Sequence, residues 1–213
     1  MSSAPRDLYR RERALARKHG GPVAGLDEVG RGPLAGPVVA AAVVLPPRGR
    51  IAGIGDSKTL DPDERERLFG EIREHALAVG VGWATSGEVD RRNILRASHL
   101  AMARAAARLR LSPAHLLVDG LPVEGLPMEH TAIVKGDGKC ACIAAASIVA
   151  KVLRDRLMRR IAGRFPQYGF DRNMGYPTPE HREALARTGP CLHHRLTFFP
   201  VREALQLELG WSA

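Results

Sequence analysis

The sequence is poor in aromatic residues, in cysteine and in long apolar runs. Phe, Trp and Tyr make up 5% of its 213 residues, and it contains three cysteines. No stretch approaches the ~18 consecutive apolar residues of a membrane-spanning helix, and the arginine-containing first 20 residues lack the apolar segment of a secretory signal. Three cysteines in a chain of this length do not indicate a disulfide framework. We therefore expect a cytoplasmic protein that is not bound to a membrane.

The composition is otherwise that of a folded globular protein. Hydrophobic residues make up 45% of the chain and charged residues 26%, which is typical of a domain with a real core. No repeat or linker divides the chain, so we expect a single domain over residues 21–213. The basic N-terminal segment, residues 1–20, is expected to form a short helix or a frayed arm.

Basic residues outnumber acidic ones, giving a net charge of +9 and a pI near 10.2. This balance is common among proteins that bind polyphosphates, although it does not by itself identify a nucleic-acid partner. Only five of the 32 basic residues are lysines.

Strand and helix patterns alternate along the chain and predict an α/β fold. Short β-branched runs bounded by glycine and proline predict strands, and a cap at Asp61 followed by Pro62 predicts the start of a helix. Strand–helix–strand order favours parallel pairing in a sheet with helices on its faces. The expected strands are 23–26, 38–45, 79–85, 115–119 and 131–135, and the expected helices are 62–78, 93–111 and 141–164.

Four acidic residues fall at the ends of expected strands. Asp27 and Glu28 follow the strand 23–26, Asp119 ends the strand 115–119, and Asp137 comes two residues after the strand 131–135. Side chains at the carboxyl ends of parallel strands converge on one crevice. Carboxylates gathered in this way repel one another and normally require divalent cations. The pattern therefore predicts an all-oxygen site for Mg²⁺ or Mn²⁺ that performs two-metal phosphoryl transfer.

A simpler interpretation of each acid is a turn former or a helix cap. For a single acid the two interpretations are equally good, but four acids at strand ends in a small basic protein favour the metal site.

The loop that follows Glu28 contains Gly30, Arg31 and Gly32. Its glycines superficially match a dinucleotide-binding loop, but that loop must open into a helix, whereas here Pro33 and a strand follow. Glycines at these positions let the backbone approach a ligand, and Arg31 between them is available for a phosphate. A tight structural turn is the alternative.

Two further features have alternative interpretations. Cys140 and Cys142 together with Cys191 and the histidines after it suggest a zinc site, but the C-x-C spacing favours buried thiols. Tyr176 lies in a turn-rich stretch, where its ring can stack on a sugar or base or can instead anchor the loop.

Seven segments resemble the ribonuclease HII family, the bacterial type 2 ribonucleases H, in the same order over nearly the whole chain. They are GLDEVGRGPLAGPVVAAAVVL (25–45), DSKTL (56–60), NILRASHLAMARA (93–105), LLVDG (116–120), KGDGKCACIAAASIVAKVLRDRLM (135–158), GYPTPEH (175–181) and HHRLTFFPV (193–201).

The resemblance implies an RNase H-like mixed five-stranded sheet flanked by helices, with a helical C-terminal region. It also implies a monomeric endonuclease that cuts the RNA strand of RNA–DNA hybrids and incises 5′ of single ribonucleotides in duplex DNA, giving 3′-hydroxyl and 5′-phosphate ends. The family's metal-binding and catalytic carboxylates fall on Asp27, Glu28, Asp119 and Asp137. Its substrate contacts fall on Gly30, Arg31, Gly32 and Tyr176, with Lys58 and Lys151 as candidate phosphate contacts.

Two positions depart from the family pattern. Met174 stands where relatives often carry lysine, which removes one expected phosphate contact, and Thr197 conservatively replaces serine. Two other functions remain open on the residues alone. One is a junction-resolving or transposase-like nuclease that needs no 2′-hydroxyl, and the other is an RNA–DNA binding module with structural acids.

Overall fold

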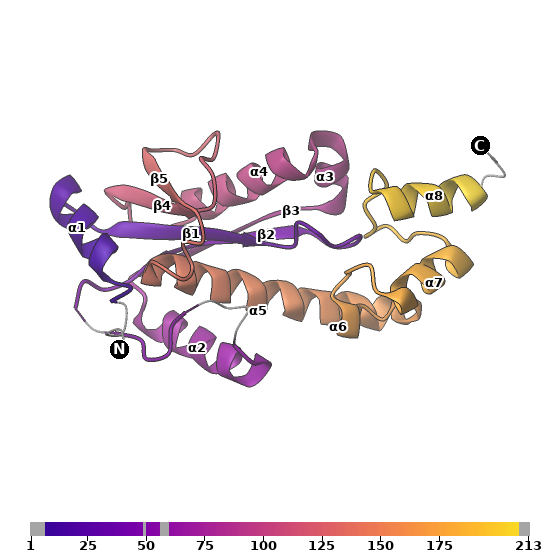
Figure 1. Ribbon diagram of the computed structural model, residues 1–213, viewed down its shortest axis with the longest axis horizontal. Coiled ribbons are helices and arrows are strands. Elements are labelled where there is room, and N and C mark those ends of the chain that lie inside the picture. The colour runs from indigo at the N-terminus through magenta and orange to yellow at the C-terminus, as the bar shows by residue number, and fades with distance from the viewer. Residues whose placement is uncertain (1–6, 49, 56–59, 209–213) are drawn as a thin grey trace, which may run out of the picture. The chain divides into compact units, whose positions relative to one another are not determined.

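The computed structural model describes residues 7–48, 50–55 and 60–208. Its centre is a mixed five-stranded sheet with strand order β3-β2-β1-β4-β5 (Figure 1). β1 runs antiparallel to β2 and parallel to β4, and β4 runs parallel to β5. The predicted mixed sheet flanked by helices is therefore confirmed. The strands are β1 (Val23–Val29), β2 (Val38–Val44), β3 (Ala78–Ala84), β4 (His115–Asp119) and β5 (His130–Ile133).

The chain divides into two compact units, and each is described by itself. The first comprises residues 1–29, 39–83 and 99–152, and the second comprises residues 30–38, 84–98 and 153–213. The single domain expected over residues 21–213 stays a prediction. The helices are α1 (Arg10–His19), α2 (Pro62–His75), α3 (Ser86–Arg92), α4 (Ile94–Ala107), α5 (Ala141–Arg164), α6 (Phe170–Asn173), α7 (Pro179–Thr188) and α8 (Phe199–Glu208), with the short 3₁₀ helix η1 at Pro166–Tyr168.

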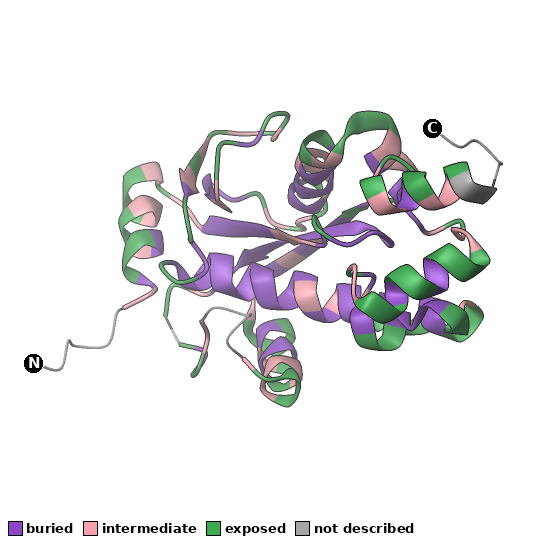
Figure 2. Ribbon diagram, turned by 45° about the vertical axis from the view of Figure 1, so that its right-hand side comes forward, coloured by how far each residue is buried: buried purple, intermediate pink, exposed green. Residues whose placement is uncertain are grey.

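The sheet of the first unit is covered on both faces, by α4 on one side and by α2 and α5 on the other (Figure 1). Every residue of β2 is buried, and Figure 2 shows that α5 is buried along the half that begins at Ala141. Gly25 of β1 permits this close packing, because a Cβ there would lie 2.2 Å from the carbonyl carbon of Cys142. Gly80 and Gly82 of β3 do the same for α4 on the other face, where a Cβ at either position would lie 2.2 Å from a helix carbonyl oxygen.

β3 is an outer strand of the sheet, and its backbone binds Arg104 of α4 and Arg108, the residue that follows α4. Arg108 donates to the carbonyl of Val81 at 2.8 Å, and Arg104 donates to that of Trp83 at 2.7 Å. The Arg108 guanidinium also lies 4.7 Å from the centre of the half-exposed Trp83 ring. These contacts occupy two carbonyls of the outer strand with charged side chains.

The helix expected over residues 62–78 begins as predicted and ends slightly early. Asp61 caps it by accepting a hydrogen bond from the Glu64 N–H at 2.8 Å, and Pro62 is its first residue. It ends at His75 because β3 already begins at Ala78.

The helix expected over residues 93–111 is α4, which begins one residue later and ends four residues earlier, and a short helix before it, α3, was not predicted. Thr85 and Glu88 form a capping box that starts α3, and Asn93, at φ 69°, separates α3 from α4. Helix α4 then ends at Ala107. The helix expected over 141–164 agrees with α5 at both ends.

Two strand ends differ from the prediction by more than one residue. β1 continues three residues beyond Leu26, because Asp27 and Glu28 keep their pairing with β2 opposite Ala41 and Ala40. These two acids therefore lie inside β1 rather than after it. β5 ends at Ile133, and Lys135 adopts a positive φ of 54°.

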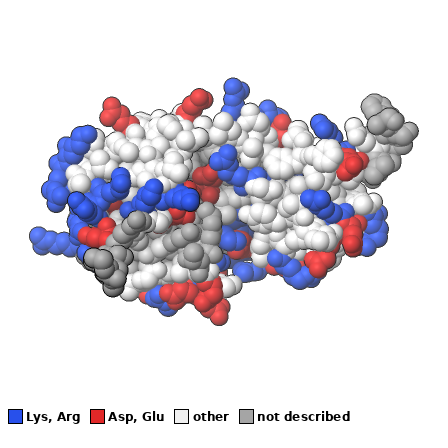
Figure 3. Space-filling model, in the orientation of Figure 1, with Lys and Arg blue, Asp and Glu red and all other residues white. Residues whose placement is uncertain are grey.

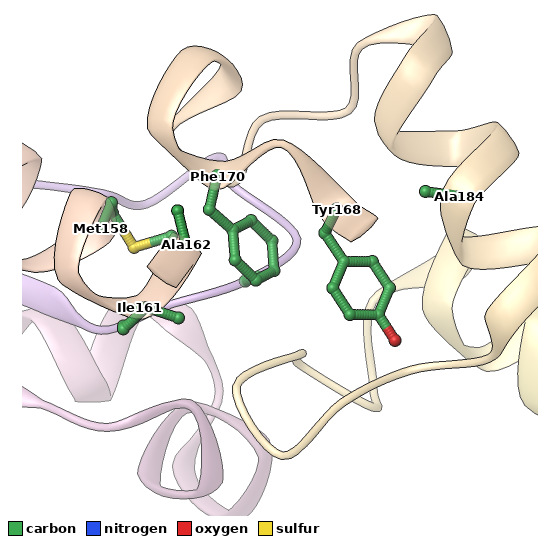
Figure 4. Close-up of a cluster of buried hydrophobic side chains, with 7 residues drawn as sticks. Met158, Ile161, Ala162, Tyr168, Phe170 and Ala184 are labelled. Atoms are coloured by element: carbon green, nitrogen blue, oxygen red, sulfur yellow. The ribbon is translucent and has the colours of Figure 1, made fainter. Parts of the chain in front are cut away.

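The second unit has its own small core, built around the C-terminal part of α5. Its members are Ala35, Met158, Ile161, Ala162, Tyr168, Phe170 and Ala184, and all seven are buried. The Tyr168 and Phe170 rings stack with their centres 5.3 Å apart (Figure 4). The predicted helical C-terminal region is thus present. In the described part of the chain, no helix is long and apolar enough to cross a membrane.

Candidate active site

The register of the parallel strands places two of the predicted carboxylates at the same level. β1 and β4 pair residue by residue up to Leu26 opposite Val118, so the next residues along the two strands are Asp27 and Asp119. Residues two apart in a strand share a face, and the residue two before Asp27 is Gly25, which faces α5. Asp27 accordingly makes a hydrogen bond with Ser147 of α5.

Asp27 is buried, and its pKa is strongly shifted. Its side chain is 5% exposed, and burial, followed by the charges of Glu28 and Asp119, raises the pKa of Asp27 well above its ordinary value. Hydrogen bonds from Ser147 and from the Glu28 N–H, at 2.7 Å, act in the opposite direction. The fold therefore gathers carboxylates in a place where the ionised form of Asp27 needs a neighbouring positive charge.

A turn between β5 and α5 holds Asp119 and carries Asp137. The Gly136 N–H donates to Asp119 Oδ1 at 2.6 Å, and a Cβ at Gly136 would lie 2.6 Å from the Ile143 side chain. Asp137 follows directly, is 5% exposed and accepts a hydrogen bond from the Gly138 N–H at 2.9 Å. Asp137 lies four residues beyond β5 rather than two, because β5 ends early. All four predicted acids are nevertheless in the first unit.

The chemistry of this donor set suits a hard divalent cation, since carboxylate oxygens are the ligands that Mg²⁺ and Mn²⁺ prefer. Within the described ranges, no three His, Cys, Asp or Glu side chains are already drawn together as a compact metal-binding group. Asp27, Asp119 and Asp137 instead each accept a backbone N–H from an adjoining residue or turn. Their assignment as metal ligands stays a prediction.

The second unit carries the glycine–arginine–glycine loop. Gly30 has a φ of 95°, and a Cβ there would lie 2.3 Å from Arg154 Nε, so only glycine fits. Arg31 is exposed. The position of a Cβ on Gly32 is 3.6 Å from the Tyr176 ring, which is 42% exposed. The structure therefore brings together Gly32 and Tyr176, which are far apart in the sequence.

A buried arginine that sequence reasoning missed holds this loop in shape. Arg195 is fully buried, and its guanidinium donates to the carbonyls of Gly30, Arg31 and Gly36. Burial, followed by the nearby charge of Arg154, lowers the pKa of Arg195 to about 9. Arg195 thus fixes the loop through its backbone and not through a carboxylate.

Arg154 of α5 also binds backbone carbonyls of this loop, and the sequence analysis did not identify it either. It is fully buried and donates to the carbonyls of Ala35, Pro37 and Met174. It therefore ties the 30–37 loop to the loop that precedes Tyr176. In a chain with so many arginines, no sequence signal distinguishes these two from surface residues.

The structure says less about the two predicted phosphate contacts, Lys58 and Lys151. Lys58 lies outside the described residues. Lys151 is half-buried on α5, in the same unit as the carboxylates. Cys140 and Cys142 are fully buried at the start of α5, as expected of buried thiols, and the Cys142 N–H donates to Glu12 at 2.6 Å.

The two departures from the family pattern have structural roles. Met174 packs against the core of the second unit, and its backbone has a positive φ of 51°. The Thr197 hydroxyl donates to Asp90 Oδ1 at 2.7 Å, and Asp90 also accepts the N–H groups of Leu196 and Thr197. A hydroxyl at position 197, from threonine or serine, meets this requirement.

Comparison with known proteins agrees with the resemblance. The ribonuclease HII family model matches residues 24–201. Ribonuclease HII of Geobacillus kaustophilus is 50% identical over 200 residues, covering 94% of this chain and 76% of that protein. Ribonuclease HII of Shewanella piezotolerans is 53% identical over 185 residues, covering 87% and 92%.

Solved structures show the same fold. Ribonuclease H2 from Pyrococcus horikoshii superposes with a TM-score of 0.78 at 30% identity, covering 87% of this chain and 98% of that one. Ribonuclease HII from Archaeoglobus fulgidus, solved in a complex with PCNA, gives a TM-score of 0.67 at 29% identity and covers 90% and 91%. The expected RNase H-like fold is confirmed. The chain belongs to the ribonuclease HII family and is an endoribonuclease of the ribonuclease H type.

Proposed function

We propose that this enzyme, which as a ribonuclease HII degrades the RNA strand of RNA–DNA hybrids, also incises duplex DNA on the 5′ side of a single embedded ribonucleotide. The products would carry 3′-hydroxyl and 5′-phosphate ends, and the cellular role would be the removal of ribonucleotides from DNA. The observation that carries the chemistry is the placement of Asp27 level with Asp119 on neighbouring parallel strands. We further propose that the enzyme acts as a monomer in the cytoplasm.

The first unit supplies the hydrolytic half of this proposal. Asp27, Glu28, Asp119 and Asp137 would hold Mg²⁺ or Mn²⁺, which activates the attacking water and stabilises the leaving oxygen of the phosphodiester. Asp27 and Asp119 are positioned by paired strands, and Asp137 is positioned by a turn whose neighbouring N–H binds Asp119. Asp27 requires a positive neighbour to ionise, which supports the assignment.

The second unit supplies the recognition half. A single ribonucleotide in DNA differs from its neighbours by one 2′-hydroxyl, so selection needs polar backbone groups at the height of the sugar. The backbone at Arg31 and Gly32 is suited to this task because both residues are exposed, whereas Gly30 is buried against Arg154 and shapes the loop. The Tyr176 ring beside Gly32 would pack on the sugar that follows the ribonucleotide. Arg31, Lys58 and Lys151 would contact phosphates.

One assay separates this function from its rivals. End-labelled all-DNA duplex, duplex with one ribonucleotide and uninterrupted RNA–DNA hybrid are each incubated with Mg²⁺ and then with Mn²⁺. We expect one cut, 5′ of the ribonucleotide, and weaker cleavage of the long hybrid. Extension of the upstream product by a DNA polymerase verifies its 3′-hydroxyl end. Cleavage of the all-DNA duplex would indicate a junction-type nuclease, and binding without cleavage would indicate a binding module.

A further inference from the structure

Two buried histidines of the second unit lie in direct contact beneath the Tyr176 loop. His181 of α7 and His194 are 0% and 2% exposed, and their Nε2 atoms are 3.0 Å apart. His181 Nδ1 lies 2.8 Å from the Tyr176 carbonyl oxygen, and His194 Nδ1 lies 2.9 Å from the Cys191 nitrogen. The pair therefore connects the backbone of Tyr176 with that of Cys191.

The partners at the two ends determine every proton in this chain of hydrogen bonds. A carbonyl oxygen only accepts, so His181 Nδ1 carries a proton and donates it to Tyr176. A backbone N–H only donates, so His194 Nδ1 is bare and accepts from Cys191. His194 Nε2 then carries the proton that it donates to the bare Nε2 of His181. Both rings are neutral, and all four ring nitrogens have a partner.

The surroundings of the pair favour this neutral state. The Tyr168 and Phe170 rings contact both histidines, with the Tyr168 ring centre 4.7 Å from that of His194. The Tyr168 hydroxyl donates to the Gly189 carbonyl, so it is engaged elsewhere. Burial lowers the pKa of both histidines, and the neighbouring His181 and then His193 act on His194 in the same direction.

We infer that His181 and His194 are positioning residues, a pair of neutral imidazoles that fixes the Tyr176 carbonyl and thereby orients the Tyr176 ring beside Gly32. The Tyr176 backbone is otherwise held by local bonds, its N–H to Asn173 and its carbonyl to the Thr178 N–H. His181 is the contact that ties it to α7, and His194 sets the tautomer of His181. The inference rests on the proposed role of Tyr176 at the junction between the ribonucleotide and DNA.

Two matched variants test it, because asparagine and glutamine each reproduce one of the two histidine nitrogens. His181→Asn places an amide N–H near the Nδ1 position and retains the donor to Tyr176, whereas His181→Gln places its amide near Nε2 and retains only the contact with His194. The readouts are the ratio of rates on a single embedded ribonucleotide and on long hybrid, with kcat and KM separated, and hydrogen exchange of the amides of residues 176–178. Tyr176→Ala serves as the reference for loss of ring contact.

We expect His181→Gln to lower the ratio by about 3- to 10-fold, the effect of one net hydrogen bond, and to speed amide exchange. His181→Asn should stay within about twofold of wild type in both. Equal behaviour of the two variants would overturn the inference. Faster exchange in His181→Gln with an unchanged ratio would support positioning and overturn the role of Tyr176 instead.

A measurement on the unsubstituted enzyme tests the inference even if a variant does not fold. Imidazole ¹⁵N shifts report which ring nitrogen carries the proton. We expect the Nδ1–H tautomer for His181 and the Nε2–H tautomer for His194 at neutral pH. The opposite assignment, or a charged ring, would overturn the inference.

Discussion

At the scale of single residues, Asp27 combines two properties that conflict in the free protein. It is almost fully buried, and the charges of Glu28 and Asp119 act on it. Such a side chain weakens the folded state when ionised, because desolvation and repulsion both oppose the charge. The same features suit a ligand whose charge is balanced by bound cations.

Replacing Asp27 with asparagine should therefore separate activity from stability. The amide keeps the shape of the side chain but removes the charge, so cleavage should fall by more than the ~100-fold cost of losing an outer-shell partner of a metal. In metal-free buffer, the free energy of unfolding in urea should be equal to that of wild type or higher by about 1–3 kcal/mol. Asp63→Asn, on the exposed face of α2, serves as the control and should change neither property. Normal turnover by Asp27→Asn in saturating Mg²⁺ would show that the site lies elsewhere.

His194 leads to a prediction about pH. Burial lowers its pKa from 6.5 to about 4, so the unfolded chain takes up a proton first as the pH falls. The contribution of His194 to stability is therefore complete above about pH 6.5 and is lost as the pH falls toward 4, by about 3 kcal/mol in total. Urea unfolding of wild type and His194→Gln at pH 7 and pH 4.5 measures this loss as a shrinking stability difference.

The comparison with a variant is needed because another group titrates in the opposite direction. Burial raises the pKa of Glu12 to about 7, so Glu12 weakens the fold as the pH rises through its ionisation. Glu12 is present in both proteins and cancels in the difference. A stability difference that does not change with pH would contradict the His194 prediction.

At the scale of elements, the 30–37 loop takes its shape from two arginines more than from its own sequence. Arg195 and Arg154 donate to carbonyls along this loop, and neither relies on a carboxylate partner for these contacts. A planar guanidinium binds several carbonyls at once, whereas a lysine ammonium on a flexible chain does not reproduce that geometry. The 30–37 loop thus depends on residues more than a hundred positions away.

Arg195→Lys should accordingly lower the free energy of unfolding by about 2–4 kcal/mol, because buried carbonyls lose their donors. Denaturant unfolding measures the change. Arg202→Lys on the exposed face of α8 is the matched control and should stay within about 0.5 kcal/mol of wild type. An Arg195→Lys protein as stable as the control would mean that the loop holds its shape unaided.

Sequence analysis predicted best those elements whose signals are local in the sequence. α5 and the start of α2 were predicted correctly because apolar runs and caps are local. The extension of β1 through Asp27 was missed because it depends on pairing with β2, and the short helix α3 was missed as well. Strand-end reasoning selected the four acids, whose role as ligands stays a prediction, whereas Arg154 and Arg195 were missed because their partners are backbone carbonyls elsewhere in the chain.

At the scale of the whole molecule, the net charge of +9 should govern the affinity for nucleic acid. Figure 3 shows basic side chains gathered over α1, where the exposed residues include Arg10, Arg11, Arg17 and Lys18. Each phosphate that the protein neutralises releases condensed counterions. Charge at this scale acts on association and not on the choice of fold.

The affinity of the Asp27→Asn variant for RNA–DNA hybrid should therefore fall steeply with salt, with a log–log slope of about −0.9 per phosphate contact. Fluorescence anisotropy at salt concentrations between roughly 50 and 200 mM measures this slope. Arg10→Gln combined with Arg11→Gln should reduce the slope if α1 touches the duplex and leave it unchanged if the contacts lie elsewhere. A flat plot for the parent variant would remove the electrostatic argument.

The arginines that bind β3 also affect the tendency of the protein to aggregate at high concentration. An outer strand with open carbonyls is a template on which extended segments of other molecules add, and this is how many aggregates begin. Here Arg104 and Arg108 already occupy the carbonyls of Trp83 and Val81, and both bring positive charge to that border. An incoming strand would have to displace two guanidinium groups. The side chains that anchor α4 to the sheet therefore also protect concentrated solutions from strand-to-strand aggregation.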